Sequence, residues 1–422
     1  MIHKWLVISY FANVDALAAS HHIDDRLPFL KQREIDIYLL SSPCGINNKN
    51  LSHTRIPSLG PSGIRYEVRY PLRRKINKKF WYKFCQVLLL LPVYPFYFIE
   101  KMFFRLDSTW SWSITAAVAA IILSIKNRPE VIYSTGGPVS AHIAAMIASY
   151  ITKIPHIAEI QDPLGDQYAA PGKFERYFMK KVEGLILKTA DVSVFLTQQA
   201  AANASLRNPE SKKIAALYAG AVPQKNALFY RRGETFNIAH FGSLAGSRNL
   251  NYFFKGMYIL FEECPDLLDC FRLSLYGKNG RDVKKQLEQF KYKEILQIYG
   301  KVERQKAVEL MYKVDVLLLV QQTDGGSFET IPSKVYEYLH TGRPILALVY
   351  RNYELQSMLE GMGHVVVQAD DEAAIKRGIE IYITRWKQDQ LQCSVLKSPH
   401  TVARAVDEFI SFVGDIGNAK KC

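Results

Sequence analysis

The sequence predicts an α/β protein built from two Rossmann-like, doubly wound domains. Three observations lead to this fold class. The chain has 422 residues, more than one hydrophobic core usually supports, which favours two domains of about 200 residues each. Short apolar segments alternate with helical segments, as in parallel sheets covered by helices. The alternation is interrupted at 219–236, a stretch with Gly, Pro and charge, and then begins again.

We place the first domain at 1–221. Its strands are predicted from short apolar runs at 4–11, 36–42, 130–135, 156–162 and 191–197. Helices are predicted near 24–34, at 139–152 and at 173–189. The N-terminal segment lacks the long apolar core and small-residue cleavage site of a signal peptide, and we expect it to form the first buried strand.

The second domain is placed at 222–398, and 399–422 is predicted to be a terminal amphipathic helix that packs back on the first domain. Its strands are predicted at 237–244, 272–277, 295–300, 315–320, 344–349 and 364–368. Its helices are predicted at 249–263, 281–289, 303–312 and about 332–340, with a short one after 349. In two such domains facing across a cleft, ligands bind at the carboxyl ends of the strands.

The composition is that of an ordinary globular protein, 48% hydrophobic and 22% charged. Six cysteines are present, without CxxC or metal-ligand spacing: Cys44, Cys85, Cys264, Cys270, Cys393 and Cys422. We expect reduced thiols, mostly buried, in a cytosolic protein. No metal site is predicted.

The net charge of +14 indicates an anionic partner. Between Arg73 and Arg105 the chain has eight basic residues and one acid, Glu100, around the segment FWYKFCQVLLLLPVYPFYFI. Cationic and aromatic side chains together are typical of a membrane interface, so we predict that 73–105 associates with an anionic membrane surface. The uncharged run Val87–Ile99 has 13 residues and two prolines, too short to span a bilayer. An ordinary buried helix with a solvated basic flank is the alternative.

The strongest candidate for a chemical site is the stretch FETIPSKVYEYLHTGRPILAL. Glu329 and Glu337 are eight positions apart, too far for a pair on one helix face. Pro332 suits the first turn of a helix, which places Lys334 near the N-terminus of that helix, where a cation and the helix dipole both favour an anion. A cation between two carboxylates suits a diphosphate flanked by sugar hydroxyls. A solvated, charge-mixed helix would explain the same spacing.

Further candidates follow other strands. Gly242 and Ser243 come directly after 237–241, with Arg248 near the next helix start, an arrangement that lets the backbone and a cation approach a phosphate. Gly300 ends another strand, and the backbone that follows it could meet a base edge. In the first domain, the strand at 156–162 ends in Glu159, Gln161 and Asp162, which would point into the cleft if the strand is parallel, and acids at strand ends are often functional. Capping of the following turn would also explain Asp162.

Several stretches together resemble retaining glycosyltransferases of family 4, which have the GT-B fold. PSKVYEYLHTGRPILAL, preceded by Glu329, resembles their signature of Glu, seven residues and Glu. IPHIAEIQDP, ADVSVFLT followed by LYAGAVP, HFGSL, LYGKNG and IYGKVERQKAVELMYKVDVLLLV resemble the family's segments in order. Two stretches depart from the family: FANVDALAAS replaces its first glycine-rich loop, and Gln161 stands where many members have His or Arg.

The resemblance implies a role for each candidate. Glu337 would hold the ribose, and Glu329 would hold the donor sugar and, with Asp162, act in catalysis. The other implied donor contacts are Lys334, Arg248, Gly242, Ser243, Val302, Gly325 and Gly326. The implied chemistry needs neither a protein nucleophile nor a metal, and fixed cations stabilise the leaving diphosphate.

We therefore predict a retaining, metal-independent glycosyltransferase of hexosyl or N-acetylhexosaminyl type. It would use a nucleotide-sugar, UDP-sugars being favoured, and act on a polyprenyl-diphosphate-linked saccharide in bacterial capsule, O-antigen or exopolysaccharide synthesis. We expect a cytoplasmic protein, peripheral on the inner face of the cell membrane. One alternative is a UDP-sugar 2-epimerase of GT-B fold, and another is a catalytically silent membrane-associated assembly protein. Nucleic acid is not an expected partner, because the basic residues cluster beside a four-leucine run instead of interleaving with aromatics along a groove.

Overall fold

The computed structural model describes residues 3–14, 17–76, 78–104, 106–164, 172–224, 230–391 and 398–419. Parts of the predicted 73–105 and 219–236 segments, including Arg105 and 225–229, lie outside these ranges, as do Cys393 and Cys422. The chain divides into two units, each described by itself: unit 1 comprises 1–218 and 402–422, and unit 2 comprises 219–401.

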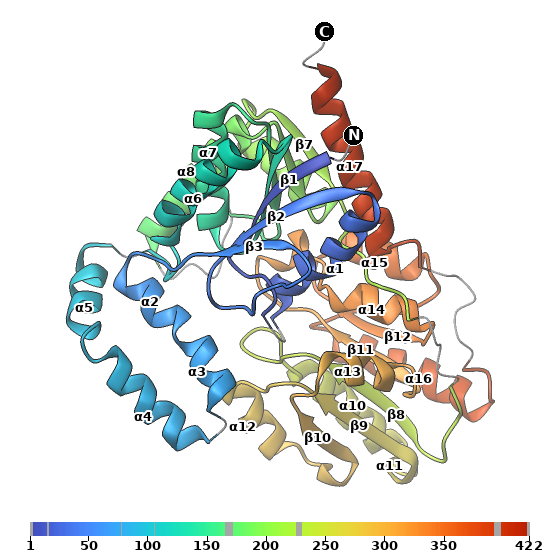
Figure 1. Ribbon diagram of the computed structural model, residues 1–422. Coiled ribbons are helices and arrows are strands. Elements are labelled where there is room, and N and C mark those ends of the chain that lie inside the picture. The colour runs from blue at the N-terminus through green and yellow to red at the C-terminus, as the bar shows by residue number, and fades with distance from the viewer. Residues whose placement is uncertain are drawn as a thin grey trace. The chain divides into compact units, whose positions relative to one another are not determined.

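The described part of unit 1 contains a parallel sheet of seven strands in the order β3-β2-β1-β4-β5-β6-β7 (Figure 1). The strands are β1 (His3–Ile8), β2 (Ile35–Ser41), β3 (Ser52–Arg55), β4 (Val131–Gly136), β5 (His156–Ile160), β6 (Val192–Phe195) and β7 (Lys213–Ala216). The helices are α1 (Ala18–Gln32), α2 (Pro61–Glu67), α3 (Arg69–Lys75), α4 (Lys79–Leu90), α5 (Tyr94–Phe103), α6 (Trp112–Asn127), α7 (Val139–Thr152), α8 (Lys173–Thr189), α9 (Gln198–Arg207) and α17 (Val402–Ala419).

Apolar side chains on the two faces of this sheet face different helices. Val7, Ile37 and Tyr133 pack with α1 and α17, whereas Leu6 and Ile132 pack with α6 and α7. The predicted return of the terminal helix to the first domain is confirmed, since α17 contacts α1 and Arg33 donates to Asp407 at 2.8 and 2.9 Å.

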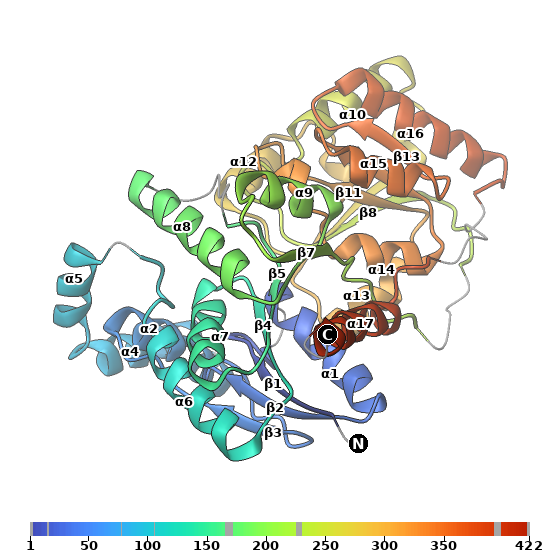
Figure 2. The same cartoon turned by 90° about the horizontal axis from the view of Figure 1, so that it is seen from above.

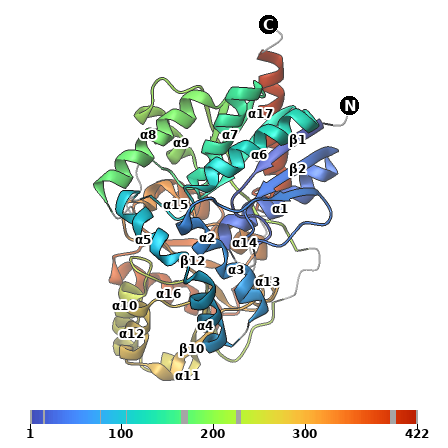
Figure 3. The ribbon, with the colours of Figure 1, turned by 60° about the vertical axis from the view of Figure 1, so that its left-hand side comes forward.

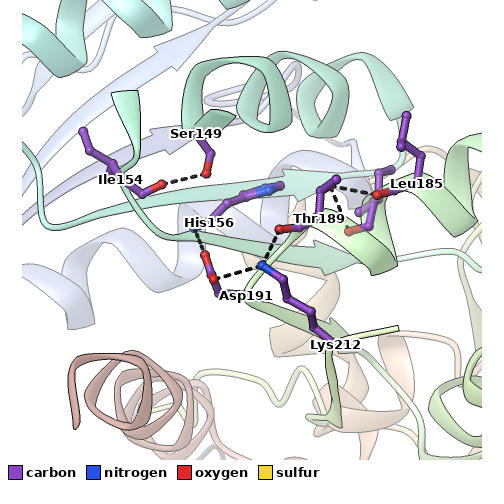
Figure 4. A network of polar contacts seen from close by, with 8 residues as sticks. Ser149, Ile154, His156, Leu185, Thr189, Asp191 and Lys212 are labelled. Atoms are coloured by element: carbon purple, nitrogen blue, oxygen red, sulfur yellow. Dashed lines mark hydrogen bonds and ion pairs between the residues drawn. The ribbon is translucent and has the colours of Figure 1, made fainter. Parts of the chain in front are cut away.

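Polar contacts fix the amino ends of β5 and β6, away from the strand ends where ligands bind in such sheets. The Asp191 carboxylate accepts from the His156 backbone N–H at 2.9 Å and from Lys212 Nζ at 3.2 Å (Figure 4). Lys212 also donates to the Thr189 carbonyl at 3.0 Å. These contacts tie β5 to the α8–β6 turn and to the residue before β7.

The described part of unit 2 contains a parallel sheet of six strands in the order β10-β9-β8-β11-β12-β13. The strands are β8 (Phe236–Phe241), β9 (Phe271–Tyr276), β10 (Leu296–Gly300), β11 (Val316–Val320), β12 (Ile345–Val349) and β13 (Val365–Gln368). The helices are α10 (Asn251–Glu263), α11 (Leu267–Cys270), α12 (Arg281–Gln289), η1 (Lys293–Ile295), α13 (Arg304–Met311), η2 (Ser327–Glu329), α14 (Lys334–Thr341), α15 (Tyr353–Glu360) and α16 (Glu372–Lys387).

This sheet is also covered on both faces. One core cluster joins it to α10, α12 and α16, and a second joins it to α13, α14 and α15. In Figure 2, α10 and α16 lie on one side of the strands, and α13 and α14 on the other. Two parallel sheets of this order, each with helices on both faces, confirm the predicted fold class.

Two predictions about burial are wrong. Of the cysteines that the structure describes, only Cys44 is buried; Cys85 and Cys270 are half-buried and Cys264 is exposed. The alternative interpretation of 80–105 as an ordinary buried helix also fails. The segment folds into two helices, α4 and α5, in which only Leu90 and Glu100 are buried. Apolar runs predicted burial here, but only part of this surface meets the rest of the unit.

Candidate functional site

Three glycines close the carboxyl ends of β8, β9 and β10 in unit 2. Gly242, Gly277 and Gly300 have φ of +130°, +139° and +69°. The Gly242 N–H donates to the Tyr276 carbonyl at 2.7 Å, and the Gly277 N–H donates to the Gly300 carbonyl at 2.6 Å. A Cβ on Gly277 would lie 2.0 Å from the Gly242 oxygen. At Gly277 the backbone of the neighbouring strand end is therefore so close that only glycine fits.

Lys334 lies against this glycine edge. It is the first residue of α14, two residues later than the helix start expected from Pro332. Its Nζ is 2.2 Å from the position a Cβ would take on Gly242, so any side chain there would displace the ammonium. The Lys334 Nζ atom is buried and has no hydrogen-bond partner among the described residues.

Two more buried nitrogens lie in the same region. His240, the last residue but one of β8, donates from Nδ1 to the Leu318 carbonyl at 2.9 Å, which leaves Nε2 as an acceptor. Neither His240 Nε2 nor Arg248 Nε has a partner in the described part of the chain. Arg248 uses another nitrogen, Nη2, for a long contact of 3.4 Å with Gln322.

The pKa values of Lys334, His240 and Arg248 show that their charges influence one another. Burial lowers the pKa of Lys334 to about 7; the Arg248 charge lowers it too, and Glu337 opposes the shift. Burial, followed by the Lys334 charge, holds the pKa of His240 well below its usual range, so this imidazole is neutral. Burial also lowers the pKa of Arg248, against the attraction of Asp324. Buried cations without partners are costly unless a ligand compensates them.

Glu337, in the first turn of α14, forms an ion pair that the sequence analysis did not anticipate. Arg304 begins α13, and its Nε and Nη2 both contact Glu337 Oε1, at 2.9 and 2.8 Å. The two side chains are 35% and 20% exposed, respectively, so the pair borders the solvent. It links the connection that follows Gly300, including the half-buried Val302, to α14.

The loop before α14 is held from both sides. Gln321, just after β11, donates to the Ser327 carbonyl at 2.7 Å, and Asn352 donates to the same carbonyl at 2.7 Å. Both side chains also donate to the Thr330 carbonyl, at 3.3 and 3.0 Å. Glu329 lies between these two fixed carbonyls and is only 4% exposed. Its position is therefore set by the ends of two strands.

The remaining predicted donor residues lie at the same edge. Ser243 follows Gly242 and is exposed. Gly325 and Gly326 are half-buried in the loop after β11, where the Gly326 N–H donates to Asp324 at 3.2 Å. Asp324 also accepts from Ser247 at 2.6 Å, and this contact joins the loop to the one that carries Arg248.

In unit 1, the residues around the end of β5 separate into two environments. Asp162 is exposed, and its Oδ2 is 3.6 Å from the position of a Cβ on Gly137. Glu159, expected from its position near the strand end to point into a cleft, is fully buried instead. Burial opposes its charge, but Arg26 and hydrogen bonds from Thr135 and Tyr133 keep the pKa of Glu159 below its usual range.

The unit 2 residues together can bind an anion with two adjacent charged groups. Lys334 lies beside the glycine backbone at the strand ends, and Arg248 and Glu337 are close enough for their charges to shift its pKa. Phosphate groups pair well with such cations and with closely approached backbone. Among the described residues, no group of His, Cys, Asp and Glu side chains is arranged to hold a metal ion.

No family model matches the sequence, and no curated protein matches it. Solved structures match along the whole chain. An α,α-trehalose 6-phosphate synthase from Burkholderia multivorans is 13% identical, with 100% of both chains covered and a TM-score of 0.65. A putative UDP-N-acetylglucosamine 2-epimerase from Listeria monocytogenes is 10% identical, with 99% of this chain and 98% of that chain covered and a TM-score of 0.57.

The lipopolysaccharide outer core galactosyltransferase WaaB in its apo form is 11% identical, with 99% of this chain and 98% of that chain covered and a TM-score of 0.56. At such identities the likeness establishes the fold alone, which is the two-domain GT-B architecture.

Proposed function

We propose that this chain is a glycosyltransferase that takes a sugar from a nucleoside-diphosphate sugar, in the first place a UDP-sugar, and transfers it to an acceptor hydroxyl. The observation that carries the proposal is the pair of buried nitrogens, Lys334 Nζ and Arg248 Nε, which have no partners among the described residues. The diphosphate of a nucleotide-sugar supplies the missing negative charge. The glycine edge at Gly242 lets that diphosphate come within reach of Lys334, which lies close enough to Arg248 for the two charges to interact.

Each residue then has a chemical task. As the bond between the sugar and the diphosphate breaks, negative charge develops on the leaving group, and Lys334 and Arg248 stabilise it. Glu337, held in place by Arg304, accepts from the ribose hydroxyls, and Glu329 accepts from the donor sugar. Transfer with retention, without a protein nucleophile or a metal, is the mechanism we propose. Asp162 is proposed to handle the acceptor hydroxyl.

The proposed acceptor is a saccharide on a polyprenyl diphosphate, as in the synthesis of a bacterial surface polysaccharide. Its support is the apolar and basic surface of unit 1 between Arg73 and Phe104, which suits a protein that works on a lipid-linked substrate.

A second candidate, a UDP-sugar 2-epimerase, is favoured by the likeness to the Listeria monocytogenes structure. The two activities differ in what happens at C2 of the sugar. An epimerase must remove the C2 hydrogen and return one from solvent, so in D₂O it labels C2 of the sugar without any acceptor. A transferase leaves C2 unlabelled and releases the nucleoside diphosphate when an acceptor is present.

The test is release of nucleoside diphosphate from a panel of nucleotide-sugars, with and without extracted lipid-linked saccharides, and with the anomeric configuration of the product read by NMR. Glu337→Ala is expected to lower turnover at least about a hundredfold, because a lost hydrogen bond and an unpaired cation each cost 1–3 kcal/mol. Glu309→Ala, which breaks the exposed Lys306–Glu309 pair on α13, is the matched control and is expected to be active. Wild-type turnover in Glu337→Ala would refute the assignment.

A further inference from the structure

Helices α4 and α5 present a large apolar surface to solvent. Along α4 the exposed residues Phe80, Phe84 and Leu88 are spaced by four, so they lie on one helix face. On α5, Phe96, Ile99 and Phe103 are spaced by three and four. These six side chains are between 52% and 73% exposed. Contiguous apolar surface of this kind marks an interaction site; we call these six side chains the α4–α5 surface.

The two helices lie at the edge of unit 1, beyond α2 and α3 (Figure 1), and Figure 3 turns this side toward the viewer. Their contacts to the unit come mainly through α3 and α2: α3 contacts α4, and α2 contacts α5. The apolar faces are therefore not the faces that hold the helices to the fold.

The two charged side chains of α5 both have hydrogen-bond partners in the protein. Glu100 is buried, and it accepts from the Ser62 N–H at 2.7 Å, which caps α2, and from Trp110 Nε1 at 2.6 Å. Lys101 donates to the Leu106 carbonyl at 2.5 Å. Because these two groups already have partners, the exposed side chains Phe96, Ile99 and Phe103 can enter an apolar medium without burying either of them unpaired.

Positive charge surrounds one end of the same surface. Arg73 and Lys75 in the last turn of α3, Lys78 before α4, and Lys79 and Lys83 in α4 are all exposed. Between Arg69 and Phe104 the only acid is Glu100, which faces inward. The surface is thus complementary to a layer that is apolar below and anionic above, which describes the headgroup and acyl boundary of an anionic bilayer.

The geometry of the pair limits how it enters that layer. No single described helix is long and apolar enough to cross a membrane; α4 and α5 meet that test only together, and they are bent by 72° at a short break. Glu100 and Lys101 hold α5 to the rest of unit 1. If α4 and α5 aligned into one straight helix, the hydrogen bond from the Ser62 N–H at the start of α2 to Glu100 would be lost.

We propose that α4 and α5 dock this protein on an anionic membrane by embedding the α4–α5 surface in one leaflet, with the basic residues around the start of α4 at the headgroups. The partner is the lipid surface itself. The docking does not require the transferase activity, so it is measured without any sugar nucleotide.

The first experiment is co-sedimentation of the full chain with vesicles of phosphatidylglycerol and phosphatidylcholine in equal parts. The double variant Phe84→Gln/Leu88→Gln is expected to lower the partition coefficient more than about tenfold, because two large apolar side chains no longer enter the leaflet. Replacing Lys78, Lys79 and Lys83 by Gln is expected to lower it about a hundredfold at low salt, roughly fivefold for each charge. Pure phosphatidylcholine is expected to bind weakly.

The matched control removes apolar surface elsewhere on unit 1. Ile122 and Ile125 are exposed on α6, to 58% and 68%, and Ile122→Gln/Ile125→Gln is expected to bind vesicles like the wild type. Circular dichroism and the melting temperature verify that each variant is folded. Equal loss of binding in the α6 and α4 variants would overturn the assignment to α4 and α5.

Trp81 reports how deep the surface lies, because it is 53% exposed on α4 whereas Trp5, Trp112 and Trp386 are buried. Trp110 is half-buried and donates to Glu100 of α5, so the measurement compares the wild type with Trp81→Phe and assigns the difference to Trp81. Its fluorescence is expected to shift to the blue with anionic vesicles and to be quenched most by lipids brominated near the headgroup end of the chain. Trp81→Phe is expected to remove most of the shift, leaving only the contribution of Trp110. Strongest quenching at the chain ends indicates a span and contradicts docking in one leaflet.

A second copy of the chain is the rival occupant of the surface. If the wild type sediments as a dimer without vesicles and Phe84→Gln/Leu88→Gln as a monomer, with no vesicle binding by either, the proposal is wrong.

Discussion

Replacing Lys334 by Met should raise the stability of unit 2 and lower its affinity for nucleotides. The change keeps most of the apolar stem but removes an ammonium that is buried without a partner among the described residues. Most substitutions of buried residues destabilise the protein. A gain in stability together with a loss of nucleotide affinity is therefore expected only for a residue whose charge serves a ligand.

The pKa of Lys334 sets the size of the stabilisation expected in Lys334→Met. In the folded protein it is about 7, against 10.5 for an unperturbed lysine. Since the folded value is the lower one, the unfolded chain binds this proton more tightly, and folding carries a cost. That cost is complete below pH 7 and disappears as the pH rises through 10.5. At pH 7 it is about 4 kcal/mol, which is the upper limit of the stabilisation expected in Lys334→Met.

Affinity should change in the other direction. Losing an ammonium that pairs with a diphosphate costs about 2–5 kcal/mol, so the Kd for UDP should rise about thirtyfold or more. Urea denaturation measures stability and isothermal titration measures binding. Lys306→Met on α13 is the control, because that lysine is exposed in a surface pair with Glu309 and neither quantity should change much. A fall in both quantities for Lys334→Met would mean that Lys334 is a structural partner, and the reasoning would fail.

Three further predictions concern the pH and the glycine edge. The pKa of Lys334 is about 7 without a ligand, and a bound diphosphate should return it to the value of an ordinary lysine. The affinity of UDP should then fall about fiftyfold between pH 7 and 9. Titration calorimetry that finds a constant affinity over this range would contradict this. Gly277→Ala, which would put a Cβ 2.0 Å from a backbone oxygen, should cost more than about 3 kcal/mol in urea denaturation. Gly246→Ala, with φ of +58° and open space around it, should cost about 1 kcal/mol, and equal costs would refute the packing argument. Burial lowers the pKa of His142 to about 4 and of His156 to about 3. Because both pKa values are lower in the folded protein than in the unfolded chain, unit 1 should lose stability as the pH falls from 6.5 toward 4. An NMR titration that finds either ring protonating near pH 6.5 would contradict this prediction.

The sequence was sufficient for the strands with continuous apolar runs. All six predicted strands of unit 2 are present, and β8, β9, β11 and β12 among them are buried, as central parallel strands are. The edge strands β10 and β13 are half-buried or exposed, but the sequence still marks them by Ile, Tyr and Val, which favour strands. It was not sufficient for β3 and β7, whose sequences SHTR and KIAA lie at the sheet edges with mostly half-buried or exposed residues. The start of α1 was also missed, since its N-cap, Leu17, has no side-chain capping bond that would mark it in the sequence.

Part of the candidate site could be predicted for the same physical reason. Gly242 and Lys334 belong to strand ends and a helix start that local pattern places. The Arg304–Glu337 pair could not be foreseen, because it joins residues 33 positions apart on neighbouring helices. His240 stands two residues before Gly242 on a buried strand, a signal that was present but not used. Glu159 shows the opposite error, since strand alternation turned its carboxylate toward Arg26 in the core.

The central claim is that the buried cations of unit 2 bind the diphosphate of a nucleotide. It is tested most directly by comparing the thermal stabilisation of the full chain by UDP and by uridine at equal concentrations. A ligand that binds only the folded state raises the melting temperature with its occupancy. We predict a clear increase of the melting temperature with UDP, little with uridine, and a much smaller increase with UDP in Lys334→Met than in the wild type. Equal effects of UDP and uridine, or no stabilisation by UDP or any other nucleoside diphosphate, would contradict it.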